Sequence, residues 1–288
     1  MPKGVALTIG INQIDPGHYG TSGKLSGCEP DAKAVAEMAK ALGFARTETL
    51  LTRDATRAKV QEAVTRIAGE LEPGDLFLLH YSGHGSQMPD TVGSTEEDDQ
   101  LDETWCLYDA EMLDDELRRL WTFFKKDVRV IIISDSCHSG SVSKGDLEES
   151  ASRDLDGGAA VVPRELPKED RDFTYRNNQA AYDNLQRAVN QNIPGADELI
   201  ATIVLLAACR DDETAKDDGQ HGVFTRAMLG VHRQGKFRQD NYTYMQLIRD
   251  IAAQIPANYE QHPRMTALDR QDLPISFGRQ KPFAVGES

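Results

Sequence analysis

The sequence predicts an α/β fold with a mostly parallel central sheet of about six strands and helices on both faces. Short apolar runs rich in β-branched residues alternate along the chain with longer stretches of helical periodicity. Several of these runs are apolar throughout, as is typical of strands that are covered on both sides. The 288 residues, of which 39% are hydrophobic, suffice to bury a sizeable core.

Two apolar runs give the strongest strand signals, namely 128–134 (VRVIIIS) and 202–208 (TIVLLAA). Side chains of this kind fit a strand that is buried within a sheet. We expect strands at 5–11, 48–52, 76–81, 105–108, 128–134 and 202–208.

The predicted helices carry apolar residues on one side and polar residues on the other. Pro30 suits the first turn of a helix, and apolar positions follow it at Val35 and Met38. We expect helices at 30–42, 56–71, 113–124, 178–189, 224–231 and 244–255.

One segment interrupts this alternation of strands and helices. Residues 143–198 are rich in Asp, Glu, Arg, Asn and Gln, and insertions this long in a compact domain tend to be functional or mobile. We therefore expect a single domain (1–288) with a large part (1–142), a mobile insertion or linker (143–198) and a smaller part (199–288).

The composition predicts the compartment of the protein and disfavours several kinds of ligand. A net charge of −15 disfavours binding to nucleic acid or to anionic lipid. No apolar run approaches the roughly 20 residues of a membrane span, and the first residues lack the features of a signal peptide. Four cysteines without a CxxC pair favour neither a disulfide framework nor structural zinc. We expect a cytoplasmic protein that binds no nucleic acid and no membrane.

Two of the predicted strands end in unusual polar sequences. Strand 76–81 runs into YSGHG around His84, and strand 128–134 runs into DSCHSG around Cys137. Ligands gather at the carboxyl ends of the strands in α/β sheets, so we expect both side chains at one edge of the sheet. Because adjacent strand residues point to opposite faces, His138 is expected to be structural.

The pair suggests nucleophilic catalysis. A cysteine nucleophile needs a base or an imidazolium neighbour that holds it as thiolate, and His84 can supply this. The backbone N–H groups of Gly85 and Cys137 are candidates for the oxyanion hole. A lone cysteine after an apolar strand is more often inert. However, an HG turn followed about 50 residues later by a cysteine matches the spacing found in caspases.

The motifs YSGHG and DSCHSG closely resemble the two catalytic motifs of metacaspases, the caspase-like cysteine peptidases of peptidase family C14. The resemblance covers residues 4–142 well and 200–270 more loosely. It implies a caspase-like fold, a His84/Cys137 dyad and a monomeric, stand-alone catalytic domain of bacterial or type I-like kind that cuts proteins and peptides. The sequence around Cys137 differs from the QACxG motif of animal caspases, which points away from cleavage after aspartate.

A basic residue is the expected target of cleavage. Asp135 precedes Cys137 by two residues, and a carboxylate beside a thiol would raise the thiol's pKa unless it met a positive group of the substrate. The segment LSGCEPDA (25–32) resembles the metacaspase stretch that adds to the specificity pocket. This implies a pocket of Cys28, Asp31, Ser82 and Asp135, which selects arginine or lysine. Asp31 also suits the N-terminus of a helix without any such role.

A calcium site is one interpretation of the acidic residues between 96 and 116, since oxygen-rich clusters suit Ca²⁺. The resemblance implies Asp102, Asp114 and Asp115 as ligands, whereas the fourth expected acid is Lys144 here, with Asp146 two residues later. A solvated acidic loop followed by the start of a helix explains the same residues without a metal. No organic cofactor is expected.

Self-cleavage is one interpretation of the basic residues in the insertion, and a merely flexible surface segment is the other. An enzyme with the expected specificity can cut its own chain after arginine or lysine. The candidate residues include Arg153, Arg164, Lys168, Arg171, Arg176 and Arg187.

Other functions fit parts of the sequence. A clostripain- or legumain-type peptidase shares the fold, and cleavage after asparagine would favour it. A catalytically silent caspase-like binding or scaffold module is the alternative outside enzymes, although retention of His84, Cys137 and the pocket acids argues against it. A nucleotide-binding domain ranks low, because no GxGxxG follows the first strand and no GxxxxGK[ST] occurs.

Overall fold

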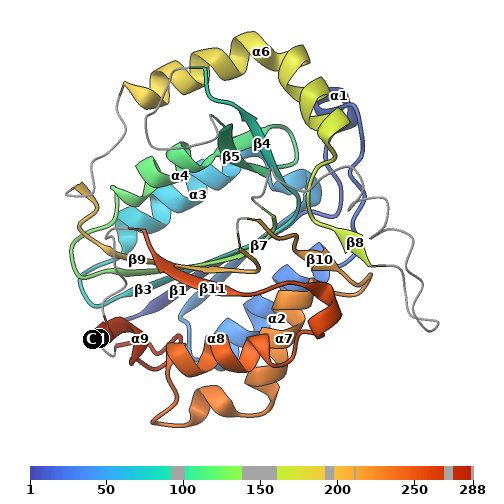
Figure 1. Cartoon of the computed structure of the whole chain (residues 1–288). Helices are drawn as coiled ribbons and strands as arrows, with labels where there is room; N and C mark the ends of the chain where they lie inside the picture. The colour runs from blue at the N-terminus through green and yellow to red at the C-terminus, as the bar shows by residue number, and fades with distance from the viewer. Residues whose placement is uncertain (92–100, 138–160, 192–197, 211, 269–274, 287–288) are drawn as a thin grey trace.

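The computed structural model describes residues 1–91, 101–137, 161–191, 198–210, 212–268 and 275–286. A six-stranded sheet lies at its centre, in the order β11-β9-β7-β3-β1-β2 (Figure 1). Neighbouring strands are parallel except for β11, which runs antiparallel to β9. The strands are β1 (Gly4–Gly10), β2 (Arg46–Leu51), β3 (Leu76–Ser82), β7 (Arg129–Asp135), β9 (Thr202–Ala207) and β11 (Arg264–Ala267). The predicted α/β class with a mainly parallel sheet is confirmed.

Helices cover both faces of this sheet. They are α2 (Cys28–Ala41), α3 (Arg57–Glu70), α4 (Asp114–Trp121), α7 (Val223–Arg233) and α8 (Tyr244–Ala252). Figure 1 shows α3 and α4 on one face and α2, α7 and α8 on the other. Successive residues of β7 alternate between the two cores, since Ile132 joins the first and Ile131 and Ile133 join the second. This double cover is why the strand sequences are apolar throughout.

Two smaller sheets accompany the central one. Their strands are β4 (Gly85–Pro89), β5 (Leu101–Cys106) and β6 (Glu111–Leu113) in the first, and β8 (Val162–Pro163) and β10 (Lys216–Asp217) in the second. The strand predicted at 105–108 corresponds to β5, which lies in the first small sheet and not in the central one. The sixth central strand is β11, whose four residues RMTA are too few and too mixed to give a strand signal.

The longest helix of the described chain is α6 (Lys168–Asn190), which falls within the predicted insertion 143–198. It begins well before the predicted helix 178–189, because few apolar residues mark its buried side. Acidic residues in its first turn complement the helix dipole. In Figure 1 it crosses the top of the molecule beside α1 (Pro16–Tyr19) and β4. Its buried residues are Thr174, Tyr182, Gln186 and Val189.

Short elements complete the described chain. They are 3-10 turns at Thr52–Asp54, Lys236–Arg238 and Ala257–Tyr259, and the helix α9 (Ile275–Gly278). The first residues lie beside the last described ones, since a Cβ at Gly286 would fall 3.4 Å from the ring of Pro2. None of the described helices has both the length and the apolar composition that crossing a lipid bilayer requires.

Gly10 sets how closely α2 approaches the carboxyl end of β1. A Cβ atom at Gly10 would lie 2.3 Å from the carbonyl oxygen of Cys28 and 2.8 Å from the Cβ of Ala32. We predict that Gly10→Ala pushes the first turns of α2 away from the sheet. The overpacking should lower the free energy of unfolding by about 1–3 kcal/mol in urea denaturation.

Gly69→Ala in α3 is the control for this prediction, since no atom lies within 4 Å of its Cβ position. Alanine is the better helix former, so this variant should be as stable as the parent protein or slightly more stable. Equal stability of the two variants would contradict the role assigned to Gly10.

Candidate active site

The carboxyl ends of β3 and β7 bring His84 and Cys137 to the same edge of the sheet. The two strands are parallel neighbours, and Ser82 pairs with Asp135 at their ends. The chain segments beyond the strands touch, because a Cβ at Gly85 would fall 1.5 Å from the carbonyl oxygen of Cys137. Only glycine permits this approach. His84 is 5% exposed and Cys137 is completely buried.

His84 is a neutral imidazole in this arrangement. Its Nε2 lies 2.9 Å from the carbonyl oxygen of Gly23, and its Nδ1 has no hydrogen-bond partner among the described residues. Burial lowers the pKa of His84 to about 4. The hydroxyl of Tyr81 donates to the carbonyl oxygens of His84 and Cys106, at 2.7 and 3.0 Å, which holds the loop after β3 in place.

Cys137 is a protonated thiol in the same arrangement. Burial raises its pKa well above the ordinary value, and the neighbouring Cys209 raises it further. The sulfur accepts a hydrogen bond from the backbone N–H of Ala215 at 2.9 Å and lies 3.4 Å from the carbonyl oxygen of the same residue. The thiol is therefore bonded to the loop after β9, and the hydrogen bonds of His84 go elsewhere.

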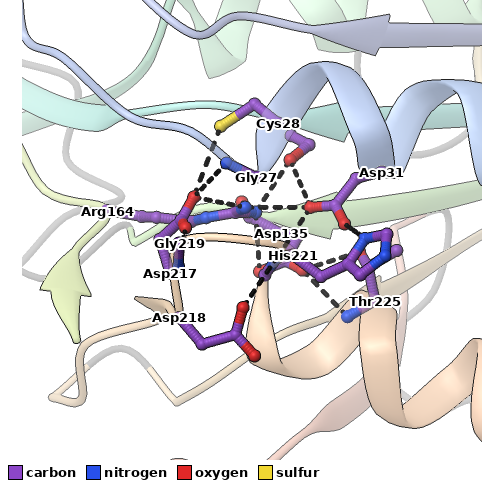
Figure 2. Close-up of polar contacts among 12 residues, drawn as sticks. Gly27, Cys28, Asp31, Asp135, Arg164, Asp217, Asp218, Gly219, His221 and Thr225 are labelled. Carbon is purple, nitrogen blue, oxygen red and sulfur yellow. Dashed lines mark hydrogen bonds and ion pairs between the residues drawn. The ribbon is translucent and has the colours of Figure 1, made fainter. Parts of the chain in front are cut away.

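The predicted pocket residues surround a single cation, the guanidinium of Arg164 (Figure 2). Its Nη2 lies 2.8 Å from Asp31 and 3.0 Å from Asp217, and its Nη1 lies 3.2 Å from Asp135. We call these three carboxylates the acidic cluster. Nη1 also donates to the hydroxyl of Ser82 at 2.7 Å. The cluster and the arginine are at most 2% exposed, so the whole arrangement is shielded from water.

Asp217 is a member of the cluster that the sequence did not single out. It lies on β10, and its Oδ2 accepts a hydrogen bond from the backbone N–H of Gly27 at 3.0 Å. Cys28, which was predicted for the pocket, is buried with its sulfur 4.0 Å from the same oxygen. In the sequence, Asp217 stands beside Asp218 in a polar stretch, and two adjacent acids of this kind are typical of an ordinary turn.

Hydrogen bonds fix each carboxylate of the cluster. Asp31 Oδ2 accepts from the backbone N–H of Gly222 at 2.9 Å, and its Oδ1 lies 2.7 Å from the Nδ1 of His221. Asp135 Oδ2 accepts from the backbone N–H and the hydroxyl of Thr225, at 2.9 and 2.6 Å. Asp31 lies in the first turn of α2 and also contacts the guanidinium of Arg164.

Two opposed effects set the pKa values in the cluster, namely burial and the attraction between the carboxylates and the guanidinium. Burial acts to raise the pKa of Asp31, but the charge of Arg164 and the bond to His221 outweigh it and hold that pKa below the ordinary value. For Asp135, burial prevails over the attraction of Arg164 and raises the pKa to about 6. Burial alone would lower the pKa of Arg164, yet its acidic neighbours raise it, so the guanidinium stays charged.

The two predicted oxyanion donors converge on one carbonyl oxygen, that of Arg164. The backbone N–H of Gly85 lies 2.9 Å from this oxygen and that of Cys137 lies 3.4 Å from it. Two fixed backbone donors that converge on one carbonyl oxygen are the arrangement that an oxyanion hole requires. A carbonyl, an acidic cluster, a thiol and an imidazole lie within one buried site.

The predicted calcium ligands lie apart from this site, at β5 and the start of α4. Burial raises the pKa of Asp102 to about 7, and the carboxylates of Asp90 and Asp115 add to the effect. Gln186 donates to Asp102 at 2.8 Å. The part of the chain that the structure describes holds no group of three acids, histidines or cysteines placed for a metal. His138, Lys144, Asp146 and Arg153 lie outside the described residues.

Comparison with known proteins places this site in context. Residues 3–273 match the family described as Caspase domain. Metacaspase-1 of Emericella nidulans is 26% identical over 96% of this chain and 72% of that protein. Metacaspase-1 of Candida albicans is 27% identical over 94% of this chain and 66% of that protein.

A solved structure gives the same result. The crystal structure of a protein from Geobacter sulfurreducens superposes with a TM-score of 0.84 and 38% sequence identity, over 99% of this chain and all of that one. The mixed sheet, the helices on both of its faces and these matches agree with one another. The chain belongs to the caspase-domain family of peptidases and is a metacaspase-like, cysteine-type endopeptidase.

Proposed function

We propose that this endopeptidase cleaves peptide bonds after arginine or lysine, with Cys137 as nucleophile and His84 as its base. The observation that carries the proposal is the contact set of Arg164. The guanidinium of this arginine lies among Asp31, Asp135 and Asp217. Its backbone carbonyl oxygen accepts hydrogen bonds from the N–H groups of Gly85 and Cys137. A substrate arginine held in this way would present its carbonyl carbon to the thiol.

The proposed reaction proceeds through an acyl-enzyme. The sulfur of Cys137 bonds to the substrate carbonyl carbon while the thiol proton passes to His84. The carbon–nitrogen bond then breaks, and His84 returns the proton to the leaving amine. Water hydrolyses the thioester, which releases the new carboxyl end and restores the thiol. A neutral His84, which its lowered pKa provides, is the form that can accept the first proton.

The acidic cluster favours arginine over lysine. A guanidinium offers several donors in a planar fork. In Arg164, one Nη atom donates to Asp31 and Asp217, and the other donates to the hydroxyl of Ser82. A lysine ammonium is a single point with three donors on a flexible stem, and it cannot span these partners at once. We expect both residues to be cleaved, and arginine faster.

Asp217→Asn tests this specificity. Removing one carboxylate removes a charge-assisted contact of about 1.5–3 kcal/mol, so kcat/KM for an arginyl reporter peptide should fall by roughly 10- to 100-fold. Asp240→Asn is the control, because Asp240 is 96% exposed and pairs with Lys281 far from the site. Full arginyl activity in Asp217→Asn would contradict the proposal, and cleavage after asparagine would favour a legumain-type peptidase. Absence of cleavage by the parent protein under all conditions would favour a silent binding module.

We also propose that Ca²⁺ acts on the protein through Asp102, Asp114 and Asp115. Carboxylate oxygens are the ligands that Ca²⁺ prefers. Burial raises the pKa of Asp102 most, Asp90 and Asp115 add to it by repulsion, and a cation would relieve that repulsion. Bound Ca²⁺ would supply positive charge where these acids crowd together. Since the described acids are not already arranged as a ligand set, binding would require them to move.

Asp102→Asn gives a prediction with a defined sign. A carboxyl whose pKa is raised to about 7 in the fold loses its contribution to stability as the pH rises from about 4 through 7. Asn carries no ionisable group and therefore avoids this loss of stability. Asp102→Asn should melt at a higher temperature than the parent protein at pH 8, and the difference between the two melting temperatures should shrink at pH 5. Millimolar Ca²⁺ should raise the melting temperature of the parent protein only. An equal Ca²⁺ shift in both proteins, or none in either, would contradict the site.

Self-cleavage is proposed at the bond between Arg164 and Glu165. Among the candidates that the structure describes, Arg164 lies against Cys137 in an extended segment, whereas Lys168, Arg171, Arg176 and Arg187 lie within α6, where helical hydrogen bonds occupy the backbone. Mass spectrometry should find fragments that end at Arg164 and begin at Glu165. The Cys137→Ala protein should stay whole, and the same fragments from that protein would show that another peptidase made them.

A further inference from the structure

The imidazole of His221 contacts the acidic cluster but has no part in the proposed reaction. Its Nδ1 lies 2.7 Å from the Oδ1 of Asp31, and Figure 2 shows the two side chains facing each other. The side chain of His221 is 23% exposed, whereas that of Asp31 is completely buried. His221 therefore lies at the boundary between the buried cluster and the solvent.

The backbone of His221 is held in a tight turn between β10 and α7. The side chain of Asp218 closes this turn, because its Oδ1 accepts hydrogen bonds from the N–H groups of Gln220 and His221, at 3.0 and 2.8 Å. The N–H of Asp218 also donates to the carbonyl oxygen of His221 at 3.0 Å. The imidazole thus projects from a fixed point of the chain.

This turn packs against the start of α2, the helix that carries Asp31. Gly27 is the residue that caps α2, and a Cβ atom at Gly27 would fall 2.7 Å from the Cα of His221. The next residue of the turn, Gly222, donates its N–H to the Oδ2 of Asp31 at 2.9 Å. Backbone contacts therefore set the position of His221 relative to Asp31 before the two side chains meet.

The hydrogen bond between the two side chains has a defined direction. Attraction by Arg164 and the bond to His221 hold the pKa of Asp31 below its ordinary value, so this carboxyl is ionised. An ionised carboxylate can only accept, so the Nδ1 of His221 carries the proton. The same bond raises the pKa of His221. Because Nδ1 carries a proton in both the charged ring and this neutral tautomer, the contact persists when the ring titrates.

The two oxygens of Asp31 have different partners. Oδ2 accepts hydrogen bonds from the hydroxyl of Ser82 and from the Nη2 of Arg164, both at 2.8 Å, while Oδ1 is bonded to His221. The terminal torsion of an aspartate is broad, so a carboxylate bonded at one oxygen only has freedom to rotate. The donor on Oδ1 restricts this rotation and keeps Oδ2 directed at the cation.

We propose that His221 is a specificity-determining residue that positions Asp31 so that the pocket accepts arginine in preference to lysine. The proposal rests on the proposed function, because it takes the acidic cluster as the site that binds the basic side chain of the substrate. One Nη atom of Arg164 bonds to both Asp31 and Asp217. A planar guanidinium needs both acceptors in fixed places, whereas an ammonium on a flexible stem can follow a displaced carboxylate. Loss of His221 should therefore harm arginine more than lysine.

The ratio of kcat/KM for an arginyl reporter peptide to kcat/KM for a lysyl one tests the inference. Both peptides meet the same thiol, the same imidazole base and the same amount of active enzyme, so their ratio reports on the pocket alone. His221→Leu removes the donor and should lower the ratio by about fivefold to tenfold, because the guanidinium loses part of a charge-assisted contact. His221→Asn should keep most of the parent ratio, since its amide nitrogen can donate from the place of Nδ1.

His262→Leu is the matched control. The Nδ1 of His262 also lies 2.5 Å from a carboxylate, that of Glu213, but Glu213 is no part of the acidic cluster. The side chain of His262 is 57% exposed. This variant should keep the parent ratio.

A second variant covers the case in which His221→Leu does not fold. Asp218→Ala keeps His221 and the acidic cluster but removes the acceptor that closes the turn. It should lower the ratio in the same direction as His221→Leu.

The outcomes separate this inference from the proposed specificity. If the parent protein cleaves both reporters and the ratio stays unchanged in His221→Leu or, where that protein does not fold, in Asp218→Ala, the basic specificity stands and the role of His221 is wrong. An equal fall in His221→Leu and His221→Asn would contradict the hydrogen bond as the cause. If the parent protein cleaves neither reporter, the basic specificity itself is wrong and the inference falls with it. A fall confined to the Leu and Asp218 variants supports both.

Discussion

The buried ion cluster of Arg164 is the interaction on which the rest of the site depends. Three carboxylates, Asp31, Asp135 and Asp217, converge from α2, β7 and β10 with almost no exposure to water. Removing an ion from water costs several kcal/mol even after relaxation, and like charges held together add to that cost. The cluster therefore needs a cation at its centre. The fold provides one from its own chain, and the proposed reaction would provide one from the substrate.

Burial around this cluster also sets the protonation of Cys137 and His84. While Arg164 fills the cluster, its segment buries Cys137 and His84, and burial keeps the thiol protonated and the imidazole neutral. The pair is thus assembled at the strand ends but is not yet ionised. Exposure to water on departure of the segment would move both pKa values toward their ordinary range, where proton transfer from sulfur to imidazole costs less.

The sequence predicted the parts of this site that depend on strand order and local motifs. Parallel strands that end in YSGHG and DSCHSG meet at one edge, and the N–H groups of Gly85 and Cys137 both donate to the carbonyl oxygen of Arg164. It did not predict Asp217 or the position of Arg164, because both come from short polar stretches whose partners lie far away in the chain. The backbone pairing of β8 with β10 puts them in the cluster, and two-residue strands leave no periodicity to read.

A single side chain, Gln186, joins α6 to Asp102, one of the predicted calcium ligands. Its amide donates to Asp102, a carboxyl whose raised pKa leaves it largely protonated below pH 7. A cation that drew the oxygens of Asp102 toward itself would compete with this bond and loosen α6 at its far end. Helix α6 begins four residues after Arg164, and Tyr182 is one of the buried residues that anchor it.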